Sequence, residues 1–209
     1  MADLELVVFD LDGTLVDSDK TVIRILNTIR KDLNLPSLYL ADVSFLFSLG
    51  GEDMIREVIE SNVDVTKYLK IFRKRYLEDS LCGERVFEGV INYLNHLRDK
   101  GIQMAIFTNK PRDLANKTLK RHQIDSFFKY IITGGDVISK KPSPEGLHMI
   151  IKKSSVSAES IIMIGDSILD QKAANSASID FFYYKSPSNQ GVLGAKSVNE
   201  FSNFNDLIG

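Results

Sequence analysis

Three short apolar runs, each ending in polar residues, constrain the fold of this chain more than any other feature. They read LELVVFD at 4–10, GIQMAIFTN at 101–109 and SIIMIGD at 160–166. Each run is partly β-branched, and long helical patterns separate them, which is typical of parallel strands covered by helices on both faces. Two weaker strand candidates are KYIIT at 129–133 and IDFFYY at 179–184. The sequence therefore predicts an α/β fold around a parallel sheet.

Helix signals fill the segments between these runs. The stretch at 87–99 places apolar residues on one face and stops at Gly101, and two others begin at a proline. A fourth follows Ser167, which is suited to cap a helix. We predict helices at 87–99, 111–122, 144–153 and 167–177.

The stretch 17–83 differs from the rest of the chain. It has no convincing strand, and we predict helices in it at about 19–34, 41–48, 52–61 and 64–79. Such an insertion directly after a strand end usually serves the functional side of a sheet. We expect an α/β core domain formed by 1–16 and 84–209, with an α-helical cap domain at 17–83.

Bulk properties narrow the class of protein. The 209 residues suffice for a core domain with a smaller partner. A net charge of −2 gives no electrostatic footprint for nucleic acid or an anionic membrane. No apolar stretch reaches membrane-crossing length, and the lone Cys82 fits a reducing compartment. We expect a soluble, cytoplasmic protein that binds neither nucleic acid nor membrane, either a monomer or a homodimer.

Polar side chains follow the three main runs at the points where the strands should end. Ligands of open parallel sheets bind beyond the carboxyl ends of the strands, so these side chains should meet there. A further carboxylate lies one helical turn beyond the last run, and a lysine pair precedes a proline. The set comprises Asp10, Asp12, Thr108, Asn109, Gly165, Asp166, Asp170, Lys140 and Lys141.

Each of these residues alone has an ordinary explanation as a turn former, a helix cap or a solvated charge. Together they favour phosphoryl transfer. Several carboxylates close together need a cation, and an oxygen-only site suits Mg²⁺. A carboxylate nucleophile would divide hydrolysis into two steps, and a second carboxyl two residues away could protonate the leaving alcohol. A lysine would add positive charge at the transferred oxygens.

These residues also resemble a known family. DLDGT at 10–14, Thr108-Asn109, Lys141 before Pro142, and GDSILD at 165–170 are similar in order and spacing to the four motifs of the haloacid dehalogenase superfamily. The resemblance covers essentially the whole chain. The stretches FEGVINYLNHLRDKG, FTNKP, TGGDVISKKPSP and GDSILDQKAA resemble its phosphoglycolate phosphatase-like branch. It implies a Rossmann-like three-layer sandwich with a small inserted helical cap.

The resemblance implies a role for each matched residue. Asp10 would be the nucleophile, and Asp12 the general acid and then the base. Mg²⁺ would be held by the Asp10 carboxylate, the Asp12 backbone carbonyl and Asp166, with Asp170 supporting the waters of the metal or Lys141. Thr108, Asn109 and Lys141 would bind phosphate, and Lys141 matches the catalytic lysine of the family. The expected activity is hydrolysis of a small phosphorylated metabolite, of the phosphoglycolate type, a sugar phosphate or a nucleotide, through an aspartyl-phosphate.

The cap adds weaker candidates. LGGEDMIRE at 49–57 resembles a loop and helix start that contact substrate in related caps. Gly50 and Gly51 would allow a close approach to the site, and Arg56 would meet an anionic substrate. A loop-to-helix junction with a solvated arginine is the competing interpretation.

Three alternatives and one departure bear on these expectations. Asp12 argues against dehalogenation, because dehalogenases of the superfamily lack this second aspartate. A phosphomutase of the β-phosphoglucomutase type stays open, as does a catalytically idle binding module with the same fold. Ser178 stands where relatives commonly have glycine, and the aromatic run at 181–184 leaves the sheet edge undetermined.

Overall fold

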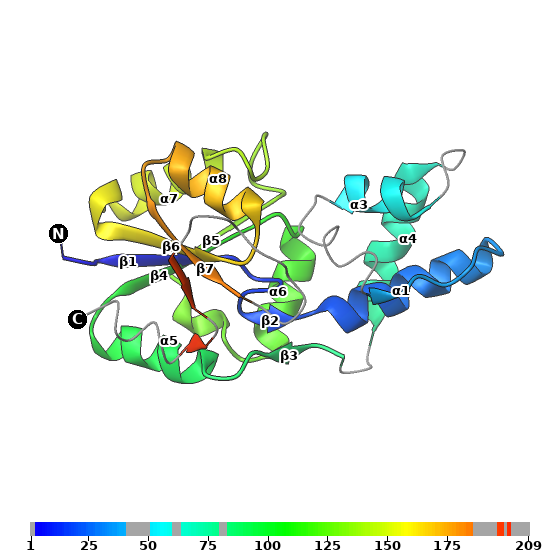
Figure 1. Ribbon diagram of the computed structural model, residues 1–209, viewed down its shortest axis with the longest axis horizontal. Coiled ribbons are helices and arrows are strands. Elements are labelled where there is room, and N and C mark those ends of the chain that lie inside the picture. Colours follow the sequence, from blue (N-terminus) through cyan, green and yellow to red (C-terminus); the bar gives the residue numbers. More distant parts are fainter. Residues whose placement is uncertain are drawn as a thin grey trace.

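A computed structural model describes residues 3–40, 51–59, 64–79, 83–185, 196–198 and 200–201. The helix predicted at 41–48 and the predicted substrate contact Gly50 lie outside the described residues. Helices flank a central sheet in one part of the molecule, and further helices lie at its other end (Figure 1).

The central sheet has six strands in the order β5-β4-β1-β6-β7-β8, and every neighbouring pair is parallel. All five predicted strands are confirmed. Among the described strands of this sheet, β8 is the one that was not predicted, because it has no apolar run. The strands are β1 (Leu6–Phe9), β4 (Gln103–Thr108), β5 (Tyr130–Thr133), β6 (Ile161–Gly165), β7 (Asp180–Tyr184) and β8 (Lys196–Val198). The chain runs from β1 outward on both sides, so the strands flanking β1 are β4 and β6. This crossover leaves a crevice at their carboxyl ends.

Four helices cover the two faces of the sheet, as predicted (Figure 1). On one face lie α5 (Val90–Asp99) and α6 (Arg112–Arg121), and on the other lie α7 (Glu145–Ser154) and α8 (Ile168–Ser176). Successive strand residues alternate between the two cores: Val7 and Phe9 pack with α5 and α6, whereas Leu6 and Val8 pack with α7 and α8. The continuous apolar runs therefore form the middle layer of a three-layer sandwich, buried on both faces. Short 3₁₀ helices lie at Asp125–Phe127 and Ala158–Ser160.

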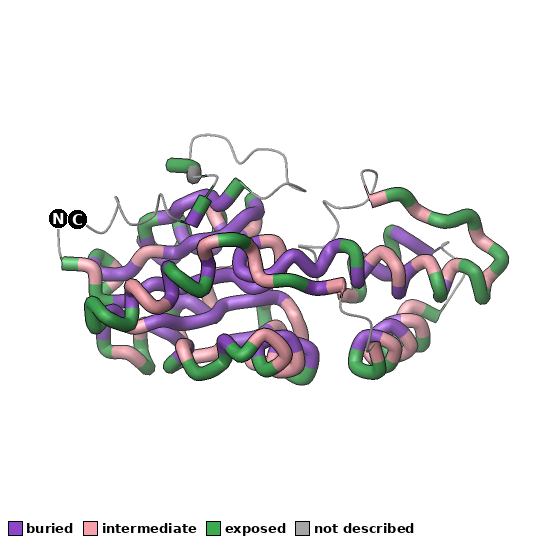
Figure 2. The backbone as a smooth tube through the Cα atoms, turned by 90° about the horizontal axis from the view of Figure 1, so that it is seen from below, coloured by how far each residue is buried: buried purple, intermediate pink, exposed green. Residues whose placement is uncertain are grey.

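The other described helices build a separate apolar cluster. They are α1 (Asp19–Asp32), α3 (Gly51–Val58) and α4 (Val65–Glu78). Their inward faces pack on one another, and Leu114 of α6 is the core residue that joins this cluster. Figure 2 shows the same pattern, with buried positions on the inner sides of these helices and exposed positions outside. No described helix reaches the length and apolarity needed to span a bilayer.

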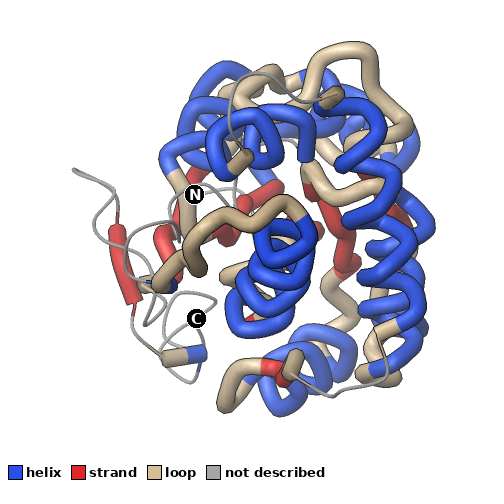
Figure 3. Tube along the Cα trace, turned by 90° about the vertical axis from the view of Figure 1, so that its right-hand side faces the viewer, coloured by secondary structure: helices blue, strands red, loops and turns tan. Residues whose placement is uncertain are grey.

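A two-stranded ribbon connects these helices to the core. β2 (Val16–Asp17) pairs antiparallel with β3 (Arg85–Val86), so the outgoing and returning chains run side by side. Arg85 Nε lies 3.1 Å from Asp17 Oδ2 across this ribbon. Sequence analysis did not predict it, because strands of two residues carry no periodic pattern. Seen from the cap end, the helices stand in front of the strand ends (Figure 3).

The aromatic run at 181–184 forms an inner strand of the sheet. β7 pairs with β6 on one side and β8 on the other. All four side chains are buried, Phe181 and Tyr183 in one core and Phe182 and Tyr184 in the other. An unbroken aromatic run is therefore what a strand covered on both faces requires.

The departure at Ser178 has a backbone explanation. Its φ is +56°, in the left-handed region that glycine tolerates best, just after α8 ends. The Ile179 N–H bonds back to the Ala174 carbonyl at 3.0 Å, which closes the helix end around this residue. A serine there carries strain that a glycine would avoid.

We expect Ser178→Gly to raise the free energy of unfolding by about 0.5–1 kcal/mol, because it relieves the left-handed serine. Urea unfolding followed by circular dichroism measures this change. Ser176→Gly, the same substitution at the last residue of α8, is the matched control and should lower stability by no more than about 0.5 kcal/mol. A loss of stability in Ser178→Gly would contradict the explanation.

Candidate active site

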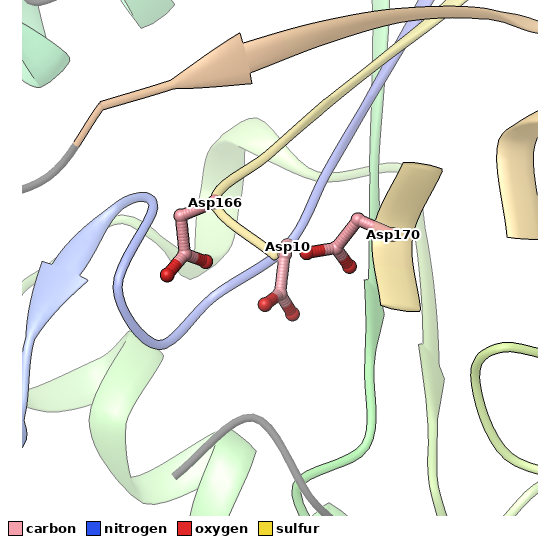
Figure 4. A group of neighbouring side chains, drawn as sticks. All are labelled: Asp10, Asp166 and Asp170. Carbon is pink, nitrogen blue, oxygen red and sulfur yellow. The ribbon is translucent and has the colours of Figure 1, made fainter. Parts of the chain in front are cut away.

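Three aspartates meet at the carboxyl ends of β1 and β6. Asp10 directly follows β1, Asp166 directly follows β6, and Asp170 lies in the first turn of α8. All three are buried, and one carboxylate oxygen from each lies within 4.8 Å of the others. In the view of Figure 4, Asp10 lies between Asp166 and Asp170.

The loop after β1 is shaped to bring Asp166 close. Gly13 has φ +81°, and a Cβ there would lie 2.2 Å from Asp166 Oδ2, so only glycine fits this approach. The Thr14 hydroxyl donates a 2.9 Å hydrogen bond to Asp166 Oδ1. Gly13 and Thr14 of the DLDGT motif are thus explained by their contacts with Asp166, which is distant in the sequence.

Asp170 uses both of its oxygens within the protein. Oδ2 accepts the Ser167 N–H at 3.0 Å and the Ser167 hydroxyl at 2.5 Å, in a capping box that starts α8. Oδ1 accepts a 2.6 Å hydrogen bond from Lys141 Nζ, which also lies 2.7 Å from Asp10 Oδ1. Asp170 therefore aims Lys141 at the oxygen of Asp10.

The charges of this cluster perturb one another. Burial, together with the nearby charge of Asp170, raises the pKa of Asp10 to about 7, although Lys141 pulls it down. Burial and the charges of Asp10 and Asp170 also hold the pKa of Asp166 well above its usual range. Burial lowers the pKa of Lys141, but the two carboxylates beside it outweigh burial and leave the pKa above its ordinary value. One lysine thus faces three buried carboxylates.

The residues predicted to bind phosphate lie at the end of β4. Thr108 and Asn109 are both buried beside this cluster. The Asn109 side chain accepts the Lys141 N–H at 2.9 Å and donates to the Lys141 carbonyl at 3.2 Å. Its amide therefore holds the lysine loop against β4, a link that sequence analysis did not foresee.

Asp12 has different hydrogen-bond partners from the other aspartates. Its Oδ1 accepts hydrogen bonds from the Ser18 hydroxyl at 2.6 Å and from Lys110 Nζ at 2.7 Å. Sequence analysis overlooked Lys110, although it directly follows Thr108-Asn109 in the FTNKP stretch. Lys110 is thus paired with Asp12, just as Lys141 is paired with Asp10.

A cavity of about 70 Å³ lies between these residues and the cap helices. Asp10, Asp12, Thr108, Asn109, Lys110 and Lys141 line its core side. The cap side is mainly apolar, with Val22, Met54, Phe72 and Tyr76 and with the predicted contact Gly51. Arg56 lies exposed on α3 and is not among the lining residues. The site therefore combines carboxylates and lysines with a small apolar chamber.

Comparison with known proteins gives the family. The family model of haloacid dehalogenase-like hydrolases matches residues 7–184. The chain belongs to this family.

Two curated relatives and one solved structure agree. A phosphoglycolate phosphatase of Cupriavidus necator is 31% identical over 92% of this chain and 87% of its own length. One of Colwellia psychrerythraea is 32% identical over 98% and 95%. A crystal structure of a predicted phosphoglycolate phosphatase from Haemophilus somnus superposes with a TM-score of 0.92 at 25% identity, covering 100% of both chains. These confirm a phosphatase of the phosphoglycolate phosphatase-like branch, as the motifs predicted.

The raised pKa of Asp10 predicts how the metal-free protein responds to pH. The folded state holds this proton more tightly than the unfolded state, whose Asp pKa is 3.8, so stability falls as pH rises from about 4 to about 7. Asp10→Asn removes this loss and should raise stability at pH 7.5 by about 1–2 kcal/mol, or roughly 2–8 °C in Tm. Thermal unfolding in a chelator at pH 5 and 7.5 measures it.

Asp180→Asn is the matched control, because Asp180 is exposed on β7. It should leave both Tm values unchanged. If the Tm of Asp10→Asn at pH 7.5 is lower than that of the wild type, while the control is unchanged, the raised pKa of Asp10 is contradicted.

Proposed function

We propose that the protein is a Mg²⁺-dependent phosphomonoesterase that forms an aspartyl-phosphate on Asp10. The observation that carries the proposal is the buried group of Asp10, Asp166 and Asp170. Among the described residues, Lys141 is the lysine that pairs with this group. An enzyme that attacks phosphate with a carboxylate must offset this negative charge. The proposed role of the cluster is to bind the cation that does so.

The donor set fits Mg²⁺. It offers carboxylate oxygens from Asp10 and Asp166 in a buried site, and hard oxygen ligands are those that Mg²⁺ prefers. We propose these two carboxylates and the Asp12 backbone carbonyl as ligands. Asp170 stays behind them, because both of its oxygens are engaged by Ser167 and Lys141. When bound, the ion supplies positive charge next to the phosphoryl oxygens and the nucleophile.

The proposed reaction divides the work between two aspartates. An Asp10 oxygen attacks phosphorus, the bond to the ester oxygen breaks, and Asp12 gives its proton to the departing alcohol. Asp12 then takes a proton from a water whose oxygen attacks phosphorus, which releases phosphate and restores Asp10. Lys141, held by Asp170, would stabilise charge on the transferred oxygens. Thr108 and Asn109 would complete the phosphate cradle.

The cavity favours a small substrate. Its volume of about 70 Å³ gives space for roughly five water-sized groups. This small volume favours a compact phosphate monoester over a nucleotide. Phosphoglycolate is the first candidate, because the curated relatives described above are phosphoglycolate phosphatases. Sugar phosphates are the next candidates.

Three further expectations belong to the same proposal. The domain boundaries are placed at 16/17 and 83/84, where the helical segment leaves and rejoins the core. A cytoplasmic location and a monomer or homodimer fit an enzyme of small metabolites. Contacts from Gly51, which lines the cavity, would help to select the substrate.

The deciding assay is release of phosphate from p-nitrophenyl phosphate with and without Mg²⁺. We expect metal-dependent hydrolysis by the wild type and a loss of at least about 10³-fold in Asp10→Asn, because the nucleophile is removed. Asp180→Asn serves as the control with unchanged activity. Metal-independent activity, or full activity in Asp10→Asn, would sink the proposal. A requirement for a bisphosphate with isomerised product would instead indicate the phosphomutase.

Asp12→Ala should separate substrates by their leaving groups. Removal of the proton donor should slow an alkyl phosphate by about 10²–10⁴-fold and p-nitrophenyl phosphate much less, because nitrophenolate departs without a proton. Steady-state kinetics on both substrates measure the ratio. Equal losses on the two would speak against Asp12 as the acid.

A further inference from the structure

Lys110 is a buried cation that the proposed mechanism does not use. Its side chain is only 7% exposed, and its Nζ donates to Asp12 Oδ1 at 2.7 Å and to the Tyr76 hydroxyl at 2.5 Å. The same Nζ lies 4.4 Å from the centre of the Tyr76 ring. Burying a charged ammonium group costs free energy unless the group is paired and hydrogen-bonded. Lys110 joins a core aspartate to a cap helix, since Tyr76 belongs to α4.

The pattern of contacts at Asp12 is asymmetric. Ser18 and Lys110 both donate to Oδ1. Within the described part of the chain, Oδ2 has no hydrogen-bond partner. The carboxyl plane is therefore fixed by two donors at one oxygen, and the other oxygen is left to carry the transferred proton.

The position of Lys110 is in turn fixed from the cap side. The Tyr76 hydroxyl donates to Glu84 Oε1, and Glu84 has a fully buried side chain. Arg121 of α6 lies 3.3 Å from the other oxygen of Glu84, and His122 lies 3.7 Å from it. A chain of contacts thus runs from the core helix α6 through Glu84 and Tyr76 to Lys110 and ends at Asp12.

We propose that Lys110 is a positioning residue that orients Asp12 for proton transfer, and that Tyr76 and Glu84 hold Lys110 in place when the cap covers the site. The proposal rests on the proposed function, since it assigns a partner to the acid of that reaction. An acid must lie within hydrogen-bond reach of the leaving oxygen, and a small rotation of its carboxyl would break that contact. Because Lys110 is held by Tyr76 of the cap, Asp12 would be correctly oriented only when the cap covers the site.

The test is a double-mutant cycle between Asp12 and Lys110. Lys110→Met keeps the length of the side chain and removes its charge. We expect kcat to fall about 10²-fold for ethyl phosphate and much less for p-nitrophenyl phosphate, with KM changed less than about threefold. Adding Lys110→Met to Asp12→Ala should cost less than about a further twofold, because Lys110 acts through Asp12. Lys110→Arg, which retains the charge, should recover part of the loss.

Lys117→Met is the matched control. Lys117 lies on α6 and donates to the carbonyls of Tyr76, Leu77 and Asp79 at the end of α4, and its hydrogen-bond partners among the described residues do not include Asp12. It should change both substrates equally. If Lys117→Met shows the same preference between leaving groups as Lys110→Met, the positioning role of Lys110 is overturned.

Other outcomes also decide. Multiplicative losses in the double variant would overturn the proposal. A rise in KM confined to phosphoglycolate would also overturn it, because Lys110 would then bind the anionic leaving group. Tyr76→Phe removes one hydroxyl and keeps the ring, so it decides the matter if Lys110→Met does not fold. A leaving-group-dependent loss there supports the proposal, and a uniform loss overturns it. Wild-type hydrolysis that depends on Asp10 secures the proposed function separately, so failure of these variants then sinks this inference alone.

Discussion

The confinement of like charges at one edge of the sheet is the constraint on which the rest of the structure depends. Asp10, Asp166 and Asp170 are buried within 4.8 Å of one another, measured between one oxygen of each. Burial and mutual repulsion disfavour their ionised forms, and Lys141 alone does not neutralise three carboxylates. The fold holds this arrangement by packing the strands beneath it on both faces, so the free energy lost at the strand ends is offset in the two cores.

The two lysines at the site pair with different aspartates. Asp10 has Lys141, which Asp170 aims, while Asp12 has Lys110, which Tyr76 contacts from the cap. Two aspartates only two residues apart in sequence thus face different lysines from different loops. This separation is consistent with the two roles proposed for them, because a carboxylate nucleophile and a proton carrier need different surroundings.

How far the sequence predicts this molecule depends on the range over which each signal acts. The five predicted strands and the flanking helices carry their pattern within a few residues, so periodicity alone indicates them. The carboxylate group was also predictable, because parallel strands end at one edge. The roles of Asn109 and Ser178 were not, since one depends on the backbone of Lys141 and the other on a left-handed φ. Lys110 was overlooked because a single lysine after a strand is ordinarily solvated.

The cap helices also contribute side chains to the site. Tyr76 reaches the site from α4, and its hydroxyl partner Glu84 lies just before β3, where the chain re-enters the core. Burial raises the pKa of Glu84, but contact with His122 and the charge of Lys110 outweigh burial and lower it to about 2. Glu84 therefore stays anionic across the physiological range and keeps its hold on Tyr76. Tyr76 and Lys110 link this charge to Asp12, so the orientation proposed for the Asp12 carboxyl would depend on the position of α4.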